Sequence, residues 1–281
     1  PSVGLVSVGK VLGEFDSDNN NGRLIHAGIR EACALGVAYG LATVGMLPVV
    51  VMFDAFVGYA LSSWRAIAMD RLPVLLLTTH KGLGVGPDDG THQSIEITEM
   101  MMDIPNVEIF EPCDYPEALR LLREAIRFLR RGIGPSYIPL TRQSLPIITN
   151  KNEDDNSSLS TAGFYIISDP PADNIIDTVI IATGAMVENA LEAAKILSNR
   201  GIYARVINIT QPKKIINDPS FISLIPKDVP IVTVCDGIPK TLEWPVLHTL
   251  NKCGLPNRVI ALGAQGFGHS ARSPEDLYKQ H

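Results

Sequence analysis

The segment between Thr79 and Gln93 gathers the residue types that most often do chemistry: four glycines, two histidines and two aspartates. Histidine can transfer a proton near neutral pH, and a carboxylate such as Asp88 can accept hydrogen bonds from a ligand. Glycines let the backbone turn tightly and approach a ligand closely. A metal site is the alternative, but the spacing of His80 and His92 matches no common set of metal ligands. We therefore predict a ligand-binding loop that holds no metal.

Three other segments hold candidate functional residues. Glu31 is the first residue of an alanine-rich stretch. It could be an acid in the first turn of a helix, where it complements the helix dipole, or it could be a functional carboxylate. Phe53, Phe56 and Tyr59 recur at a spacing that places them on one face of a helix. That face could belong to the core or could stack on a flat heterocycle. Arg142 directly follows a predicted strand, where it could form a surface ion pair or bind a phosphate or carboxylate.

The elements that must position these residues follow from the spacing of apolar side chains. Before residue 150, the pattern predicts strands over 48–53, 74–78 and 136–140, and helices over 29–44 and 119–129. After residue 160, it predicts strands over 178–182, 203–209 and 230–234, with a helix that ends before Gly201. Short buried runs that alternate with amphipathic helices are typical of parallel sheets covered on both faces. We therefore predict an α/β fold of two domains in series, 1–148 and 173–281, joined by a polar linker over 149–172.

Composition excludes several classes of protein. The chain is 46% apolar and 19% charged, which is typical of a globular protein. Its apolar runs are too short to cross a bilayer, and no signal peptide opens it, so we expect no membrane partner. A net charge of -6 without a basic stripe predicts no nucleic-acid partner. Four widely spaced cysteines fit reduced thiols, and we expect a cytoplasmic protein.

Taken together and in this order, the four segments resemble the pyrimidine-binding domain of the transketolase family. The family's Gly-Ile-Arg-Glu, Phe-x-x-Phe-x-x-Tyr, histidine loop and Ser-Arg-Gln-Asn-Leu motifs all have counterparts here. The later segments Ile180–Gly184, Gly266–Gly268 and Asp276–Lys279 resemble the family's C-terminal domain. The resemblance covers nearly the whole chain. It implies a thiamine-diphosphate enzyme of the pentose phosphate pathway that transfers a two-carbon ketol unit between sugar phosphates.

The resemblance also implies roles for the cofactor-facing residues. Glu31 matches the glutamate that hydrogen-bonds N1′ of the aminopyrimidine and so helps the cofactor to lose its thiazolium C2 proton. Phe53, Phe56 and Tyr59 match the aromatic residues around the pyrimidine ring. His92 matches a histidine at the reacting centre, where it would bond the substrate oxygen and assist proton transfer.

Four further residues match positions that bind the substrate. Asp88 corresponds to the aspartate that recognises an acceptor hydroxyl group. His80, Arg142 and Ser2 correspond to positions that anchor the sugar phosphate.

The loop departs from the family pattern at several positions. Lys81 and Gly82 stand where the family has Asp-Ser, and Pro87 replaces a glutamate. Asp89-Gly90 stands where the family has Gly-Pro, and Ser94 replaces a proline. These changes affect the expected acceptor preference more than the cofactor.

The diphosphate half of the cofactor site has no counterpart in these residues. The family binds the diphosphate through a divalent metal held by Gly-Asp-Gly and a downstream asparagine, but neither Asp89-Gly90 nor Asp236-Gly237 follows a glycine. We therefore expect a partner, the diphosphate-binding N-terminal subunit, which holds most of the Mg²⁺ or Ca²⁺ site. The chain would be a split-transketolase subunit or a product of processing, and would self-associate in a heterotetramer with a shared dimer interface.

Alternatives within enzymes are a dihydroxyacetone-synthase-like activity, the beta subunit of a 2-oxo-acid dehydrogenase and deoxyxylulose-phosphate synthase. The Arg30-Glu31 pair and the two-histidine loop argue against the last two. The alternative from another class is a non-catalytic regulatory or scaffold subunit.

Overall fold

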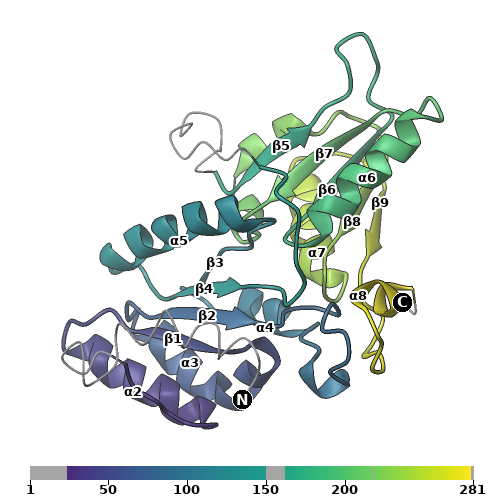
Figure 1. Ribbon diagram of the computed structural model, residues 1–281. Coiled ribbons are helices and arrows are strands. Elements are labelled where there is room, and N and C mark those ends of the chain that lie inside the picture. The colour runs from purple at the N-terminus through teal and green to yellow at the C-terminus, as the bar shows by residue number, and fades with distance from the viewer. Residues whose placement is uncertain (1–23, 150–161, 217, 280–281) are drawn as a thin grey trace.

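A computed structural model describes residues 24–149, 162–216 and 218–279 as two α/β domains (Figure 1). The helices and strands of the first domain are α2 (Glu31–Thr43), β1 (Val49–Phe53), η2 (Asp54–Ala60), α3 (Leu61–Met69), β2 (Leu75–Thr79), η3 (Gly90–His92), α4 (Ile97–Asp103), β3 (Glu108–Ile109), α5 (Tyr115–Arg130) and β4 (Ser136–Pro139). Those of the second are β5 (Phe164–Ser168), β6 (Thr178–Ala182), α6 (Met186–Ser198), β7 (Ala204–Ile209), η4 (Lys214–Ile216), η5 (Pro219–Leu224), β8 (Ile231–Val234), α7 (Lys240–Lys252), β9 (Val259–Leu262) and α8 (Pro274–Tyr278). The two-domain α/β fold expected from the sequence is confirmed.

The sheet of the first domain is parallel, with strand order β1-β2-β4-β3. Helices α2 and α3 lie on one side of it and α5 on the other (Figure 1). Trp64 and Leu35 belong to the buried cluster on the α2 and α3 side, whereas Leu121 and Leu129 pack against Leu75 on the α5 side. The central strands are therefore buried on both faces, as their continuous apolar sequences predict.

The sheet of the second domain has strand order β5-β7-β6-β8-β9, and β5 alone among these strands runs antiparallel to its neighbour. Helix α6 ends at Ser198, shortly before the left-handed glycine Gly201 with φ +77°, as the sequence predicts. Strand β5 lies inside the segment predicted as a linker over 149–172. This corrects the C-terminal end of the linker, because residues 164–168 pair with β7 and complete the second sheet.

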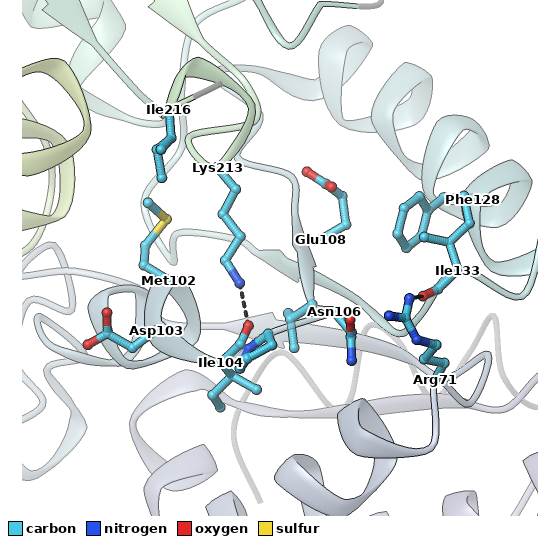
Figure 2. A pocket seen from close by; sticks show the side chains of 12 residues that line it. Arg71, Met102, Asp103, Ile104, Asn106, Glu108, Phe128, Ile133, Lys213 and Ile216 are labelled. Atoms are coloured by element: carbon cyan, nitrogen blue, oxygen red, sulfur yellow. Dashed lines mark hydrogen bonds between the residues drawn. The ribbon is translucent and has the colours of Figure 1, made fainter. Parts of the chain in front are cut away.

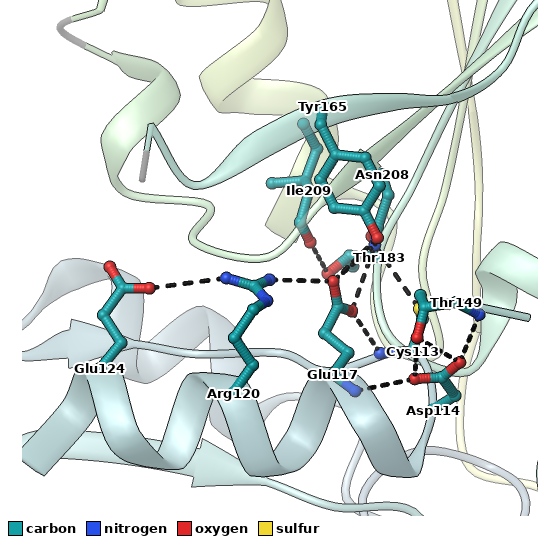
Figure 3. A network of polar contacts seen from close by, with 10 residues as sticks. All are labelled: Cys113, Asp114, Glu117, Arg120, Glu124, Thr149, Tyr165, Thr183, Asn208 and Ile209. Carbon is teal, nitrogen blue, oxygen red and sulfur yellow. Dashed lines mark hydrogen bonds and ion pairs between the residues drawn. The ribbon is translucent and has the colours of Figure 1, made fainter. Parts of the chain in front are cut away.

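A buried polar network joins the two domains (Figure 3). Glu117, on the first domain's α5, accepts hydrogen bonds from Tyr165 Oη at 2.9 Å and from Asn208 Nδ2 at 3.2 Å, both on the second domain. Asp114 caps the start of α5 by accepting from Glu117 N, and it also accepts from Thr149 at the end of the first domain. Because a buried carboxylate is costly unless it is hydrogen-bonded, this network fixes how the two domains meet.

Candidate active site

The predicted site residues gather where the parallel strands of the first sheet end. Strand β1 ends at Phe53, β2 leads directly into His80, and Arg142 follows shortly after β4. Ligands of open α/β sheets bind in the crevice outside the carboxyl ends of the strands. Topology therefore brings three motifs that are far apart in the sequence to one edge of the sheet.

The aromatic segment after β1 forms one continuous face. It is a 3₁₀ helix, η2, in which residues three apart lie almost in line. The rings of Phe53 and Phe56 are 5.7 Å apart, and Phe56 stacks on Tyr59 at 6.0 Å with an interplanar angle of 30°. Phe53 and Phe56 are half-buried and Tyr59 is 77% exposed, so this face reaches the surface. Exposed ring faces of this kind can stack on a flat heterocycle.

The two histidines of the loop lie against the same aromatic face. The His80 ring centroid is 4.1 Å from that of Phe53, and the His92 centroid is 5.9 Å from Phe53 and 5.3 Å from Phe56. The structure therefore brings four predicted site residues into ring contact, although His80 and His92 come from opposite ends of the loop.

His80 is held in an unusual conformation. Its backbone is left-handed, with φ +68°, and its Nδ1 lies 3.0 Å from Thr79 Oγ1. Burial lowers the pKa of His80, and the positive charge of Arg142 lowers it further, while Asp88 raises it. These effects together favour the neutral ring, which can both accept and donate a hydrogen bond.

Asp54 anchors the floor of the site, a role that we did not predict from the sequence. Its side chain is fully buried and accepts hydrogen bonds from the hydroxyl groups of Thr78, Ser94 and Tyr137, each at 2.5 Å. Burial raises the pKa of Asp54, and the three hydroxyl groups oppose that rise. The signal in the sequence is an aspartate between the end of an apolar strand and an aromatic segment, where a solvated acid is unexpected.

Arg142 and Asp88 form an ion pair beside the histidines. Arg142 Nη1 also donates to the Val85 carbonyl at 2.6 Å, so the guanidinium group is held against the loop. Arg142 lines a pocket of about 350 Å³ together with Gly84–Pro87 and Arg272. Asp88 follows Pro87 directly in the chain. Arg272, from the second domain, adds a second cation that sequence reasoning missed, because nothing local links it to the loop.

Glu31 and Ser2 stand apart from this cluster. Glu31 is the first residue of α2, half-buried, and α2 packs against β1 and η2. No described residue forms a ring contact or a hydrogen bond that joins Glu31 to the histidines, so its place in the site depends on a ligand between them. Ser2 lies outside the described residues.

A second pocket, of about 410 Å³, lies at the opposite edge of the first sheet (Figure 2). It is lined by residues that precede β2, β3 and β4, such as Arg71, Asn106 and Ile133, and by Lys213 of the second domain. Lys213 Nζ donates to the Ile104 carbonyl at 2.5 Å, and burial lowers its pKa to about 8. Because this pocket faces the amino ends of the strands, it is separate from the histidine site.

The part of the chain that the structure describes holds no candidate metal site and no candidate membrane span. No group of three or more His, Cys, Asp or Glu side chains there is arranged to hold a metal ion. No helix in the same residues combines the length and the apolar character needed to cross a bilayer.

Comparison with known proteins identifies both domains. Residues 4–147 match the family model of the transketolase pyrimidine-binding domain, and residues 163–281 match that of the transketolase-like C-terminal domain. Transketolase 2 of Xanthobacter flavus is 32% identical over 255 residues, which cover 89% of this chain and 35% of that protein. Transketolase 1 of Saccharomyces cerevisiae is 31% identical over 265 residues, which cover 92% and 35%. The chain spans about a third of the length of these relatives.

Solved structures agree with the family models. Transketolase from Leishmania mexicana superimposes with a TM-score of 0.75 at 28% identity, covering 95% of this chain and 37% of that one. A structure described as a split gene transketolase, inactive beta4 tetramer, superimposes with a TM-score of 0.76 at 27% identity and covers 98% of this chain and 90% of that one. The chain therefore belongs to the transketolase family, in which it corresponds to the C-terminal half, a pyrimidine-binding domain followed by the C-terminal domain.

Proposed function

We propose that this chain is the pyrimidine-binding half of a thiamine-diphosphate-dependent enzyme that transfers a two-carbon ketol unit between sugar phosphates. The observation that carries the proposal is the cluster of His80 and His92 against Phe53 and Phe56. Proton-transferring groups lie there beside a face that suits a flat ring, at the edge of the sheet where ligands bind.

The side chains present fit the pyrimidine end of thiamine diphosphate. The face of Phe56 and Tyr59 offers stacked rings that reach the surface, and α2, which begins at Glu31, packs against η2. When bound, the cofactor supplies the nucleophilic carbon for ketol transfer. Glu31 would hold a proton shared with a ring nitrogen of the pyrimidine, and the aromatic side chains would orient that ring.

The remaining residues are suited to hold the sugar phosphate. His92 would donate to the oxygen of the reacting carbonyl group, and the neutral His80 ring would bond the substrate further along. Asp88 would accept from a sugar hydroxyl group, and Arg142 would bind the phosphate through its planar fork. Ser2, by its position in the sequence motif, remains a proposed additional phosphate anchor.

The diphosphate and its Mg²⁺ or Ca²⁺ would be held by a polypeptide outside these 281 residues. The absence of a Gly-Asp-Gly sequence supports this proposal. So does the extensive match to a split gene transketolase tetramer that is described as inactive. We propose that the active form is a heterotetramer in which two copies of this chain each pair with a diphosphate-binding chain.

Replacing Arg142 by leucine tests the substrate class. In the assembled enzyme, KM for a phosphorylated ketose donor is expected to rise by about tenfold to a hundredfold, the loss that corresponds to one charge-assisted hydrogen-bond pair. KM for an unphosphorylated ketose should change little. Initial rates with each donor measure the difference.

The matched control is Arg127→Leu, which removes an exposed arginine from the last turn of α5. It should leave both KM values unchanged. Equal effects of Arg142→Leu on phosphorylated and unphosphorylated donors would contradict the phosphate role. Efficient use of formaldehyde as the acceptor would favour the dihydroxyacetone-synthase-like alternative.

A further inference from the structure

The loop that carries the two histidines is closed at a narrow neck. Gly82 N donates to the Ser94 carbonyl at 2.9 Å, and Ser94 N donates back to the Gly82 carbonyl at 3.3 Å. His80 lies just outside this neck and His92 just inside it, so a shift of the neck moves both rings relative to the aromatic face.

One side of the neck is joined by a buried ion pair to Glu111, which in turn contacts the second domain. Lys81 Nζ lies 2.6 Å from Glu111 Oε1, and both side chains are almost fully buried. The other oxygen of Glu111 lies 2.6 Å from Thr183 Oγ1, and Glu111 N donates to the Thr210 carbonyl. Burial alone would lower the pKa of Lys81, but the charge of Glu111 and its hydrogen bond raise it above its ordinary value, which favours the charged form of Lys81. A pair in this environment is costly to break on one side only.

A buried carboxylate holds the other side of the neck. Asp236, which follows β8, accepts from Leu83 N at 3.0 Å through Oδ1 and from Tyr278 Oη at 3.0 Å through Oδ2. Gly82 has φ +85°, and a β-carbon there would lie 2.0 Å from Asp236 Oδ2. Only a glycine can therefore stand at position 82 while Asp236 keeps its place.

The contacts on the two sides of the neck explain why Lys81 and Gly82 depart from the family's loop sequence. An aspartate at position 81 would put a second carboxylate against Glu111, and a serine at position 82 would overlap Asp236. We infer that Lys81, Gly82, Glu111 and Asp236 form one interdomain lock, in which Lys81 and Asp236 are positioning residues that set where His80 and His92 lie. The geometry of the lock does not depend on the proposed function, whereas its importance for turnover rests on that function.

Histidine NMR signals and amide hydrogen exchange of the full 281-residue chain test the lock. In Lys81→Met, the ring signals of His80 and His92 are expected to shift. Exchange at Leu83 N–H should accelerate by about tenfold or more, because the unpaired Glu111 displaces the neck and weakens the bond from Leu83 N to Asp236. The double variant Lys81→Met/Glu111→Gln should return both readings towards wild type, because it leaves no unpaired buried charge.

The matched control is Glu117→Gln, in the other interdomain network (Figure 3). It should lower the melting temperature without moving either histidine signal. If Lys81→Met shifted these signals no more than Glu117→Gln does, Lys81 would only support the domain interface and the lock would be overturned. Neither the histidine signals nor the exchange rate requires turnover. The lock can therefore be disproved while the proposed function stands, and the proposed function can be disproved while the lock stands.

If Lys81→Met does not fold, two variants of Asp236 test the lock instead. Asp236→Asn keeps an acceptor oxygen for Leu83 N, whereas Asp236→Ala removes it. The alanine variant is expected to exchange at Leu83 at least about tenfold faster than the asparagine variant, with a shifted His92 signal. Identical His92 signals and exchange rates in the two variants would contradict the inference.

Discussion

In the assembled protein, changing Glu31 to glutamine is expected to lower the rate of ketol transfer by about 10²–10⁴-fold, the usual contribution of a positioned acid or base. Glutamine keeps the size of the side chain and its hydrogen bonding but cannot share a proton with a ring nitrogen. Glu31 is the first residue of α2 and is half-buried, and α2 packs against the aromatic helix η2. Steady-state rates at saturating cofactor measure the loss.

Glu188→Gln is the matched control for Glu31. Glu188 is also a glutamate in the first turn of a helix, α6, but it is exposed and belongs to the second domain. Its replacement should leave the rate unchanged. If Glu31→Gln had no effect on the rate while assembly stayed intact, the chain would be a regulatory or scaffold subunit rather than a catalytic one.

Replacing Asp54 by alanine is expected to lower the free energy of unfolding by about 3–5 kcal/mol, a large share of the stability of an ordinary domain. The reason is that three buried hydroxyl groups, those of Thr78, Ser94 and Tyr137, lose their common acceptor. Asp54→Asn keeps one acceptor oxygen and should cost about 1–2 kcal/mol. Urea unfolding followed by circular dichroism measures both changes.

Asp89→Ala provides the comparison for Asp54. Asp89 is exposed and its side chain accepts from the neighbouring Gly90 N, so the loss of that side chain should cost less than about 1 kcal/mol. A loss for Asp54→Ala no larger than that for Asp89→Ala would mean that the hydroxyl groups find other partners and that Asp54 does not anchor the site.

Local sequence patterns were sufficient to predict the fold. The strand predicted over 178–182 coincides with β6, and the helix that ends before Gly201 is α6, because apolar periodicity and a left-handed glycine are local signals. The aromatic segment after Phe53 was interpreted as one face of a helix, and it forms a 3₁₀ helix rather than an α-helix. Spacing by threes suits both, so the pattern could not distinguish them.

The contacts between domains could not be predicted in this way. Leu83 and Asp236 are 153 positions apart in the sequence, and no local pattern joins them. Lys81 and Gly82 were visible only as departures from a family motif, and their partners Glu111 and Asp236 look like ordinary acids at strand ends. The residue types of the candidate site were thus visible in the sequence, whereas the contacts that position them came only from the structure.

The most direct test of the central claim is the ketol-transfer rate as a diphosphate-binding transketolase chain is added to a fixed amount of this chain. The assay contains thiamine diphosphate, Mg²⁺, a ketose phosphate and an aldose phosphate. We predict no transfer by the 281-residue chain alone and a rate that rises until the two chains are equimolar. Full transfer by this chain alone, or no transfer at any ratio, would contradict the account.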